Sequence, residues 1–240
     1  MKRIVFILTA SLFFTHASFA ETVLKFTQIK DTPDQVVGAE ILKEAYKKIG
    51  ISIEILIMPG KRALKESSEG RADGEVHRIF EIGENYPTLL RVPTPINYIE
   101  PSVFSKKHHF KVTSCSALKD FDIAIVRGIK HAELCVEGMK NVIVFPYITE
   151  MLKLLDADKF DLAITAKLNG LLLKKEMNMK SIYPLSPPLS RMFVYHYLHE
   201  KNKGLVSKID DVIIKMKETG ELEIIREKAI KALLEKVKSN

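Results

Sequence analysis

The amino-acid sequence predicts an α/β protein in which strands and helices alternate along the chain. Short apolar, β-branched runs recur, and between them lie segments whose apolar residues keep helical spacing. Alternation of this kind is typical of sheets with parallel strands that are covered by helices. A second series of strands and helices, with its own hydrophobic periodicity, follows after residue 107, so we expect two α/β lobes.

The elements of the first series have recognisable ends. Residues 23–27 form a short apolar strand, and after a polar turn a helix with regularly spaced apolar residues continues until Gly50 ends it. Residues 51–57 are β-branched and nearly continuous, which predicts a buried strand. A Pro-Gly turn then leads into a helix expected over residues 61–69.

The second series is predicted on the same grounds. Strands are expected at residues 122–126, 142–145 and 160–165, and helices at 129–135, 149–155 and 167–176. After a loop rich in Pro and Ser, residues 192–198 are extended again. Two helices with many charged residues, over 203–217 and 218–236, close the chain.

The first 20 residues have the pattern of a secretory signal peptide. Two basic residues precede an apolar run over residues 4–14, and Ser18 and Ala20 supply the small residues of a cleavage site. The run is shorter than the roughly 20 residues that span a bilayer. Position 21 is Glu and not the cysteine of a bacterial lipoprotein, so we expect a soluble periplasmic protein that is not membrane-spanning.

The composition gives ample material for a core and excludes a nucleic-acid-binding protein. Of all residues, 46% are hydrophobic, and loss of Lys2 and Arg3 with the signal lowers the net charge from +7 to +5. The charges alternate in sign, as in LKEAYKKIG, which is typical of solvated helix faces. We expect no cofactor, because the chain has no phosphate loop, dinucleotide fingerprint or Gly-x-Ser-x-Gly elbow.

The cysteines and histidines predict a disulfide and no metal site. Cys115 and Cys135 form an even pair in an oxidising compartment, which favours a disulfide over two buried free thiols. His196 and His199 are three residues apart on an expected strand, so they point to opposite faces. No cluster of cysteines or carboxylates completes a metal site around the histidines.

Residues 59–107 carry the most specific pattern in the chain. A helix ends with EG and is followed by RADGE at 71–75, by a polar turn that contains Arg78, and by PTP at 93–95, which leads into an extended segment up to residue 105. This order resembles the first lobe of bacterial extracellular solute-binding proteins of family 3, the substrate-binding type of polar amino-acid ABC transporters. The resemblance covers essentially the whole mature sequence.

The resemblance implies a type II periplasmic-binding-protein fold, with two α/β lobes joined by a two-crossover hinge around a ligand cleft. Lobe 1 would comprise residues 21–107 and 191–240, and lobe 2 residues 108–190. The implied function is capture of a small polar, anionic or zwitterionic solute, such as an amino acid or related carboxylate. A monomer without enzymatic activity would present the closed form to an inner-membrane ABC permease.

Two other functions stay open under the same resemblance. The protein would act as a ligand-sensing periplasmic module if a signalling receptor, and not a permease, recognises its closed form. A few relatives of this fold are periplasmic enzymes of the cyclohexadienyl-dehydratase type, which use a carboxylate in the cleft as general acid. Glu75 is the candidate for that role here.

The candidate ligand-binding residues are Arg62, Glu75, Arg78, Tyr98, Arg127, Gly128, Thr165 and Asn169. Arg62 lies at the start of a helix, where free N–H groups and the helix dipole favour an anion, although a solvated arginine fits the same position. Arg78 is expected just past the carboxyl end of a short strand. Glu75 is expected either to bind a ligand amine or to pair with Arg78, and Tyr98 either to cover the ligand or to support the hinge.

The second lobe contributes the remaining candidates. Arg127 and Gly128 join a strand to a helix, and the N–H groups after this turn form a possible anion nest. Thr165 and Asn169 flank the end of the third strand and are expected to donate hydrogen bonds to a ligand.

Three features of the family are missing at their expected positions. The arginine that clamps an α-carboxylate is replaced by Asn85, and the second-lobe aspartate that binds an α-ammonium is replaced by Ala166. The hydroxyl residue after the glycine of the second-lobe turn is replaced by Ile129. The sequence therefore supports the fold more strongly than it supports an amino-acid ligand.

Overall fold

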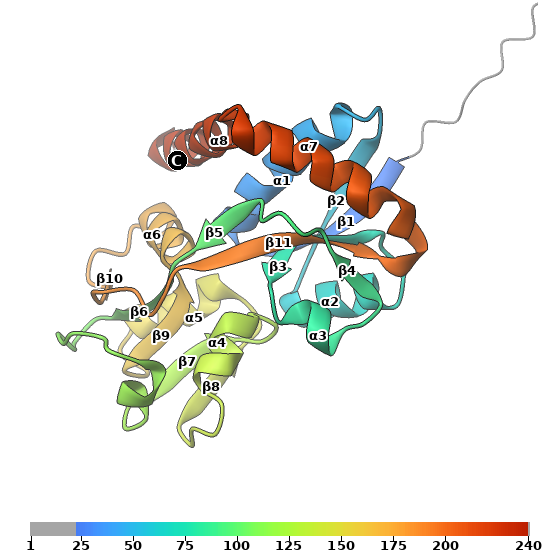
Figure 1. Ribbon diagram of the computed structural model, residues 1–240. Helices are drawn as coiled ribbons and strands as arrows, with labels where there is room; N and C mark the ends of the chain where they lie inside the picture. The colour runs from blue at the N-terminus through green and yellow to red at the C-terminus, as the bar shows by residue number, and fades with distance from the viewer. Residues whose placement is uncertain (1–22, 240) are drawn as a thin grey trace, which may run out of the picture.

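The computed structural model describes residues 23–239, which form two β-sheets covered by helices (Figure 1). The α/β class and the presence of two sheets, both predicted from the sequence, are confirmed. The predicted signal peptide at residues 1–20 lies outside the described residues.

The first sheet contains six strands in the order β2-β1-β3-β11-β4, with β5 also paired to β11. Its strands are β1 (Val23–Ile29), β2 (Ser52–Met58), β3 (Gly74–Ile79), β4 (Leu89–Arg91), β5 (Asn97–Ile99) and β11 (Met192–His199). Strand β1 runs parallel to β2 and β3, whereas β11 runs antiparallel to β3, β4 and β5. A strand from the far end of the chain therefore lies inside the sheet, between β3 and the short strands β4 and β5.

The second sheet contains five strands in the order β10-β6-β9-β7-β8. Its strands are β6 (Pro101–Ser105), β7 (Ile123–Val126), β8 (Val142–Phe145), β9 (Leu162–Ala166) and β10 (Tyr183–Pro184). Strand β7 is parallel to β8 and β9, and β6 is antiparallel to β9 and β10. The two sheets thus share one plan, in which parallel strands meet an antiparallel strand from elsewhere in the chain.

Helices cover both sheets (Figure 1). Those of the first part are α1 (Pro33–Lys47), α2 (Gly60–Ser68) and α3 (Ile82–Asn85), and those of the second are α4 (Lys130–Cys135), α5 (Ile148–Asp156) and α6 (Lys167–Glu176). Helices α7 (Val206–Glu218) and α8 (Glu221–Ser239) return to the first sheet, where both contact α1. Two 3-10 helices occupy Cys115–Leu118 and Glu200–Leu205.

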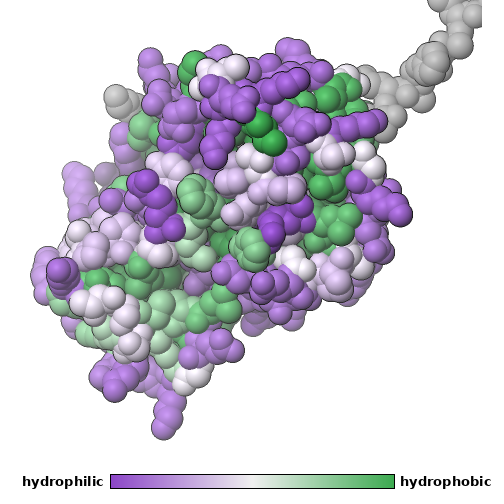
Figure 2. Space-filling view, viewed as in Figure 1, coloured by the Kyte–Doolittle hydropathy of each residue, from purple (hydrophilic) through white to green (hydrophobic). Residues whose placement is uncertain are grey.

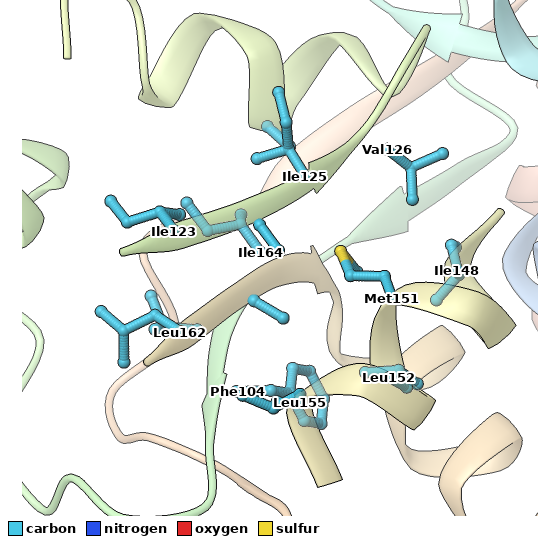
Figure 3. Packing of buried hydrophobic residues seen from close by; sticks show 14 of the residues in the cluster. Phe104, Ile123, Ile125, Val126, Ile148, Met151, Leu152, Leu155, Leu162 and Ile164 are labelled. Atoms are coloured by element: carbon cyan, nitrogen blue, oxygen red, sulfur yellow. The ribbon is translucent and has the colours of Figure 1, made fainter. Parts of the chain in front are cut away.

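Each sheet has its own buried core. Figure 3 shows the core of the second sheet, where Phe104 of β6 lies beside Leu155 of helix α5. In the first sheet Phe26 packs against Tyr46 of α1, with their ring centroids 5.1 Å apart. A third buried cluster, which includes Ile99 of β5 and Ala166 of β9, packs residues of both sheets together where the two halves meet.

The core of the first sheet also encloses a histidine. His196 of β11 is fully buried, and its Nε2 lies 2.8 Å from the hydroxyl of Tyr46, while Nδ1 lies 2.7 Å from the carbonyl oxygen of Glu75. Burial lowers the pKa of His196 to about 4, so the ring is neutral at neutral pH. This histidine therefore has a packing role in the core of the first sheet.

The chain crosses between the sheets twice, between β5 and β6 and again between β10 and β11. The first crossing lies at Glu100, because Pro101 already pairs with Ala166 of β9. The lobe boundary expected at residue 107 lies beyond this strand. The difference arises because residues 97–105 form two strands that pair with different sheets, although their sequence is continuously extended.

The predicted disulfide between Cys115 and Cys135 is confirmed, and it joins the first 3-10 helix to the end of α4. Figure 2 shows polar and charged side chains over most of one face of the molecule, with smaller apolar patches between them. Among residues 23–239, no helix combines the length and apolar character needed to cross a membrane.

Candidate functional site

A cavity of about 40 Å³ lies where the carboxyl ends of strands from both sheets meet. On the side of the first sheet it is lined by residues that end or follow β1 and β3, including Ile29, Asp34 and Ile79. On the side of the second sheet, His131 follows β7 and Asn169 follows β9. Open α/β sheets usually bind ligands beyond the carboxyl ends of their strands, so this cavity is the candidate site.

Contacts between the two halves hold the cavity closed. The backbone N–H of Asp34 donates to Oδ1 of Asn169 at 2.9 Å, and Nη1 of Arg78 donates to the carbonyl oxygen of Gly128 at 2.9 Å. The hydroxyl of Thr149 donates to a carboxylate oxygen of Asp31 at 2.7 Å. Each of the three hydrogen bonds joins a residue in the half of the molecule built on the first sheet to a residue in the half built on the second sheet.

Arg78 and Glu75 form a buried ion pair beside the cavity. Their side chains are only 4% and 1% exposed, and Nε and Nη2 of Arg78 both donate to the Glu75 carboxylate. Glu75 also accepts from the hydroxyl of Ser67 at 2.8 Å, and Nη2 of Arg78 donates to the carbonyl oxygen of Gly60 at 3.2 Å. Of the two roles considered for Glu75, the structure therefore contains the pairing with Arg78.

The sequence predicted that Arg78 lies past the end of a short strand, and this prediction is wrong. Arg78 is part of β3, which continues to Ile79, because β11 pairs with β3 along this stretch. Its guanidinium donors point to Glu75, Gly60 and Gly128. Arg78 lines the cavity, yet four of its five N–H donors bond the protein itself.

Asp34 is the most exceptional residue of the cavity. It lies in the first turn of α1 and is 7% exposed, and among the described residues its Oδ1 has no hydrogen-bond partner. Nε2 of His77 lies 3.8 Å from Oδ2 of Asp34 and 3.2 Å from its carbonyl oxygen. Burial lowers the pKa of His77 and outweighs the opposing attraction of Asp34, so His77 is neutral at neutral pH.

The second sheet contributes His131 and Lys130, which begin helix α4. Nε2 of His131 is buried and has no partner in the part of the chain that the structure describes. Burial lowers the pKa of His131 to about 4, which leaves a neutral ring at neutral pH. Nζ of Lys130 lies 2.6 Å from Oε2 of Glu133, so this cation is already paired.

The predicted anion nest at Gly128 is filled by the chain itself. The N–H of Gly128 donates to Oε1 of Glu133 at 2.6 Å, and the N–H of Ile129 donates to the carbonyl oxygen of Val126 at 3.1 Å. Burial raises the pKa of Glu133, but the hydrogen bonds from Lys130 and Gly128 outweigh it, and the net pKa is lowered. The ionised carboxylate of Glu133 therefore takes up the Gly128 N–H, and the Ile129 N–H is bonded within the turn.

Six of the eight predicted residues are absent from the cavity lining, and three of these six are Arg62, Arg127 and Tyr98. The side chain of Arg62 is 70% exposed and lies 3.8 Å from Glu66, because the first turn of α2 directs it to solvent. The side chain of Arg127 is also exposed. Tyr98 is half-buried beside a separate hollow, with its ring between the guanidinium groups of Arg191 at 4.5 Å and Arg226 at 4.3 Å.

The other two second-sheet candidates are buried. Asn169 is 2% exposed, lines the cavity and bonds Asp34 across it. Thr165 is 1% exposed, and its hydroxyl has no partner among residues 23–239. Thr165 pairs with Ser102 in the sheet, one residue before the end of β9.

Four residues that line the cavity were not among the candidates predicted from the sequence: Asp34, His77, Lys130 and His131. One signal was available for Asp34, since it lies in the first turn of the helix that follows the first parallel strand, near the strand end where ligand contacts usually occur. The sequence pattern between the first strand and the first helix predicts only a polar turn. Within the described range, no three His, Cys, Asp or Glu side chains form a group that could hold a metal ion.

Comparisons with known proteins show the fold and leave the ligand open. No protein-family model matches the chain. A protein of Shewanella oneidensis described as uncharacterized is 27% identical over 198 residues, which are 79% of this chain and 74% of that protein.

Two solved structures illustrate the likeness. A histidine kinase sensor domain with similarity to periplasmic binding proteins matches with a TM-score of 0.75 at 18% identity, over 86% of this chain and 95% of that chain. An amino acid ABC transporter substrate-binding protein from Streptococcus pneumoniae, bound to L-arginine, matches with a TM-score of 0.71 at 16% identity, over 88% of this chain and 95% of that chain. The chain therefore has a periplasmic-binding-protein-like fold.

Proposed function

We propose that this protein captures a small polar solute in the cavity between its two sheets, which are the cores of two hinged lobes. The solute is anionic or zwitterionic, such as an amino acid or a related carboxylate. The protein works as a periplasmic monomer and presents its closed form to an inner-membrane ABC permease. The observation that carries the proposal is the cavity itself, enclosed at strand ends from both sheets and bridged by hydrogen bonds from Asp34 and Arg78.

Closure of such a cavity depends on contacts made to both halves at once. A ligand that touches Asp34 or His77 on one side and His131 or Asn169 on the other gains its full contacts only when the lobes meet. Binding energy is thereby converted into a closed shape that a permease can distinguish from the open one. Solved structures of the same fold include amino-acid-binding proteins, which supports this reading.

Capture is favoured over catalysis by the surroundings of Glu75. This carboxylate, the candidate general acid, is held by Arg78 and Ser67 and is not among the side chains that line the cavity. A general acid must reach the reacting atom of a bound substrate.

The proposal is tested by thermal melting of residues 21–240 against amino acids, dicarboxylates and amines. A solute present at 100 times its Kd stabilises the folded state by about 2.7 kcal/mol. For a domain of this size that corresponds to a rise in Tm of roughly 5–10 °C. A protein whose Tm responds to no member of the panel does not act in solute capture.

A second candidate function is sensing, because the structural match to a histidine kinase sensor domain has a TM-score of 0.75. A deletion strain distinguishes the two functions, because import and sensing predict the loss of different activities of the cell. If the protein serves import, a deletion strain loses uptake of the stabilising solute. If it serves sensing, uptake continues and the transcriptional response to that solute disappears.

A further inference from the structure

The charged side chains of the cavity leave one negative charge without a matching cation. The lining contains Asp34, Arg78 and Lys130 as its ionised residues. Arg78 is paired with Glu75, and Lys130 is paired with Glu133. Both cations are therefore neutralised by carboxylates of the protein, whereas no Lys or Arg nitrogen of the described chain lies within 4.0 Å of the Asp34 carboxylate.

The histidines near Asp34 do not replace the missing cation. His77 is the nearest, with Nε2 at 3.8 Å from Oδ2, but its burial favours the neutral ring. His131 lines the same cavity and is also neutral at neutral pH, since burial lowers its pKa to about 4. A neutral imidazole offers Asp34 at most a hydrogen bond and no compensating charge.

An unpartnered carboxylate oxygen at this depth lowers the free energy of unfolding. Asp34 is 7% exposed, and no donor in residues 23–239 bonds its Oδ1. Buried carboxylates in proteins are normally paired with a cation or satisfied by several donors. Asp34 also borders a hollow that contains Lys167 and Arg226, but Arg226 is held by Asn97 and Glu223.

We infer that the cavity selects solutes that carry a cationic nitrogen, an alkylammonium or a guanidinium group, which binds the carboxylate of Asp34. The inference rests on the proposed function and narrows it: zwitterions and organic cations bind, and purely anionic solutes do not. The cationic group enters the cavity of about 40 Å³, which has room for little more than such a group.

The space next to the cavity has a matching charge. A hollow of about 490 Å³ shares Ile79 and Lys130 with the cavity and is lined further by Glu81, Glu133 and Glu137. Within the described residues, Oε2 of Glu81 is buried without a partner. The remainder of the solute therefore meets a wall that is rich in carboxylates, which again disfavours an anion.

The inference is tested with three probes that share a five-carbon chain and differ only in their end groups: cadaverine, 5-aminovalerate and glutarate. Thermal melting and calorimetric titration of residues 21–240 are run with these probes and with the amino acids. We expect every solute that raises the Tm to carry a cationic nitrogen, and we expect glutarate to have no effect. Stabilisation by glutarate, or by any solute without a cationic nitrogen, overturns the inference and leaves solute capture intact.

The variant that isolates the charge is Asp34→Asn, which keeps the backbone N–H that bonds Asn169. Its matched control is Glu40→Gln on the same helix, where the carboxylate is half-exposed and pairs with Lys43. We expect D34N to weaken binding of a stabilising cationic solute at least tenfold and E40Q to leave it unchanged. Equal affinity of D34N and the unaltered protein overturns the inference.

A second measurement separates binding from folding. Without solute, D34N is expected to melt at or above the temperature of the unaltered protein, because the substitution removes an uncompensated buried charge. A Tm far below that of the unaltered protein would show that Asp34 is a structural residue and contradict the inference. If no solute of any charge stabilises the protein, the proposed function fails first.

Discussion

Alanine at position 128 should weaken solute binding by separating the two sides of the cavity. Gly128 has a φ of +85°, and a Cβ built on it would lie 2.3 Å from the backbone nitrogen of Lys61 and 2.4 Å from the carbonyl carbon of Gly60. Both are backbone atoms, so no rotation of a side chain relieves the overlap. The segment around Gly60 and the turn at Gly128 must therefore move apart.

The magnitude follows from the contact that this movement breaks. Nη1 of Arg78 donates to the carbonyl oxygen of Gly128 at 2.9 Å, across the boundary between the two halves. A hydrogen bond to a charged group contributes about 1.5–3 kcal/mol. If closure forms this bond, as the proposed function requires, we expect the Kd for a solute to rise about 10- to 150-fold in Gly128→Ala.

The left-handed backbone adds a cost of about 1–2 kcal/mol for alanine, but this cost acts on folding and is the same with and without solute. Gly138→Ala supplies the matched control, because Gly138 has a φ of +76° and no other atom of the described residues lies within 4 Å of the place that a Cβ would take there. Calorimetric titration with a stabilising solute should give the unaltered Kd for G138A and the raised Kd for G128A. Equal Kd values for the two variants would refute the reasoning.

Three further predictions concern stability. His196 and His131 each have a pKa lowered to about 4, so their neutral forms stabilise the fold at neutral pH; this contribution is lost as pH falls from about 6.5 towards 4, and urea unfolding at pH 5 should show a loss of about 2 kcal/mol for each of the two histidines relative to pH 7. Serine at both Cys115 and Cys135, which are 20 residues apart, should lower the free energy of unfolding by about 3 kcal/mol in urea, and an unchanged midpoint would contradict this. Glu75→Gln leaves the buried Arg78 charge unpaired and should cost about 3 kcal/mol or more, measured by the same unfolding.

The regular elements were predictable because their hydrophobic patterns are long and continuous. The strand at 142–145 and the helix at 167–176 have the predicted limits in the structure. Helix α3 and strand β4 were not predicted, since four and three residues are too short for a period to be recognised.

The end of β3 was predicted too early, because Arg78 was expected beyond it and is part of the strand. All six of its residues are buried, and three of them are Glu75, His77 and Arg78. A strand pattern shows polar residues on the solvent side, whereas here the carboxylate and the guanidinium are buried together as a pair. Pairing of this kind depends on contacts that the order of residues does not contain.

The cavity lies where the sequence predicted a cleft, but only two of the eight candidate residues line it. A cleft at the carboxyl ends of strands from two sheets was expected, and Arg78 and Asn169 do line the cavity. The sequence indicated arginines and free N–H groups that would hold an anion. In the structure Arg78 donates to Glu75, and the N–H of Gly128 donates to Glu133. Asp34 becomes prominent only when its burial and its unpartnered oxygen are known.

The central claim, solute capture between the two sheets, is tested most directly by a crystal structure of residues 21–240 grown with the solute that raises the Tm most. We predict electron density for one solute molecule whose cationic group lies in the cavity between Asp34 and His131 and which contacts residues of both halves. Density at another place, such as the groove between α1 and α8, with the cavity empty would contradict the account.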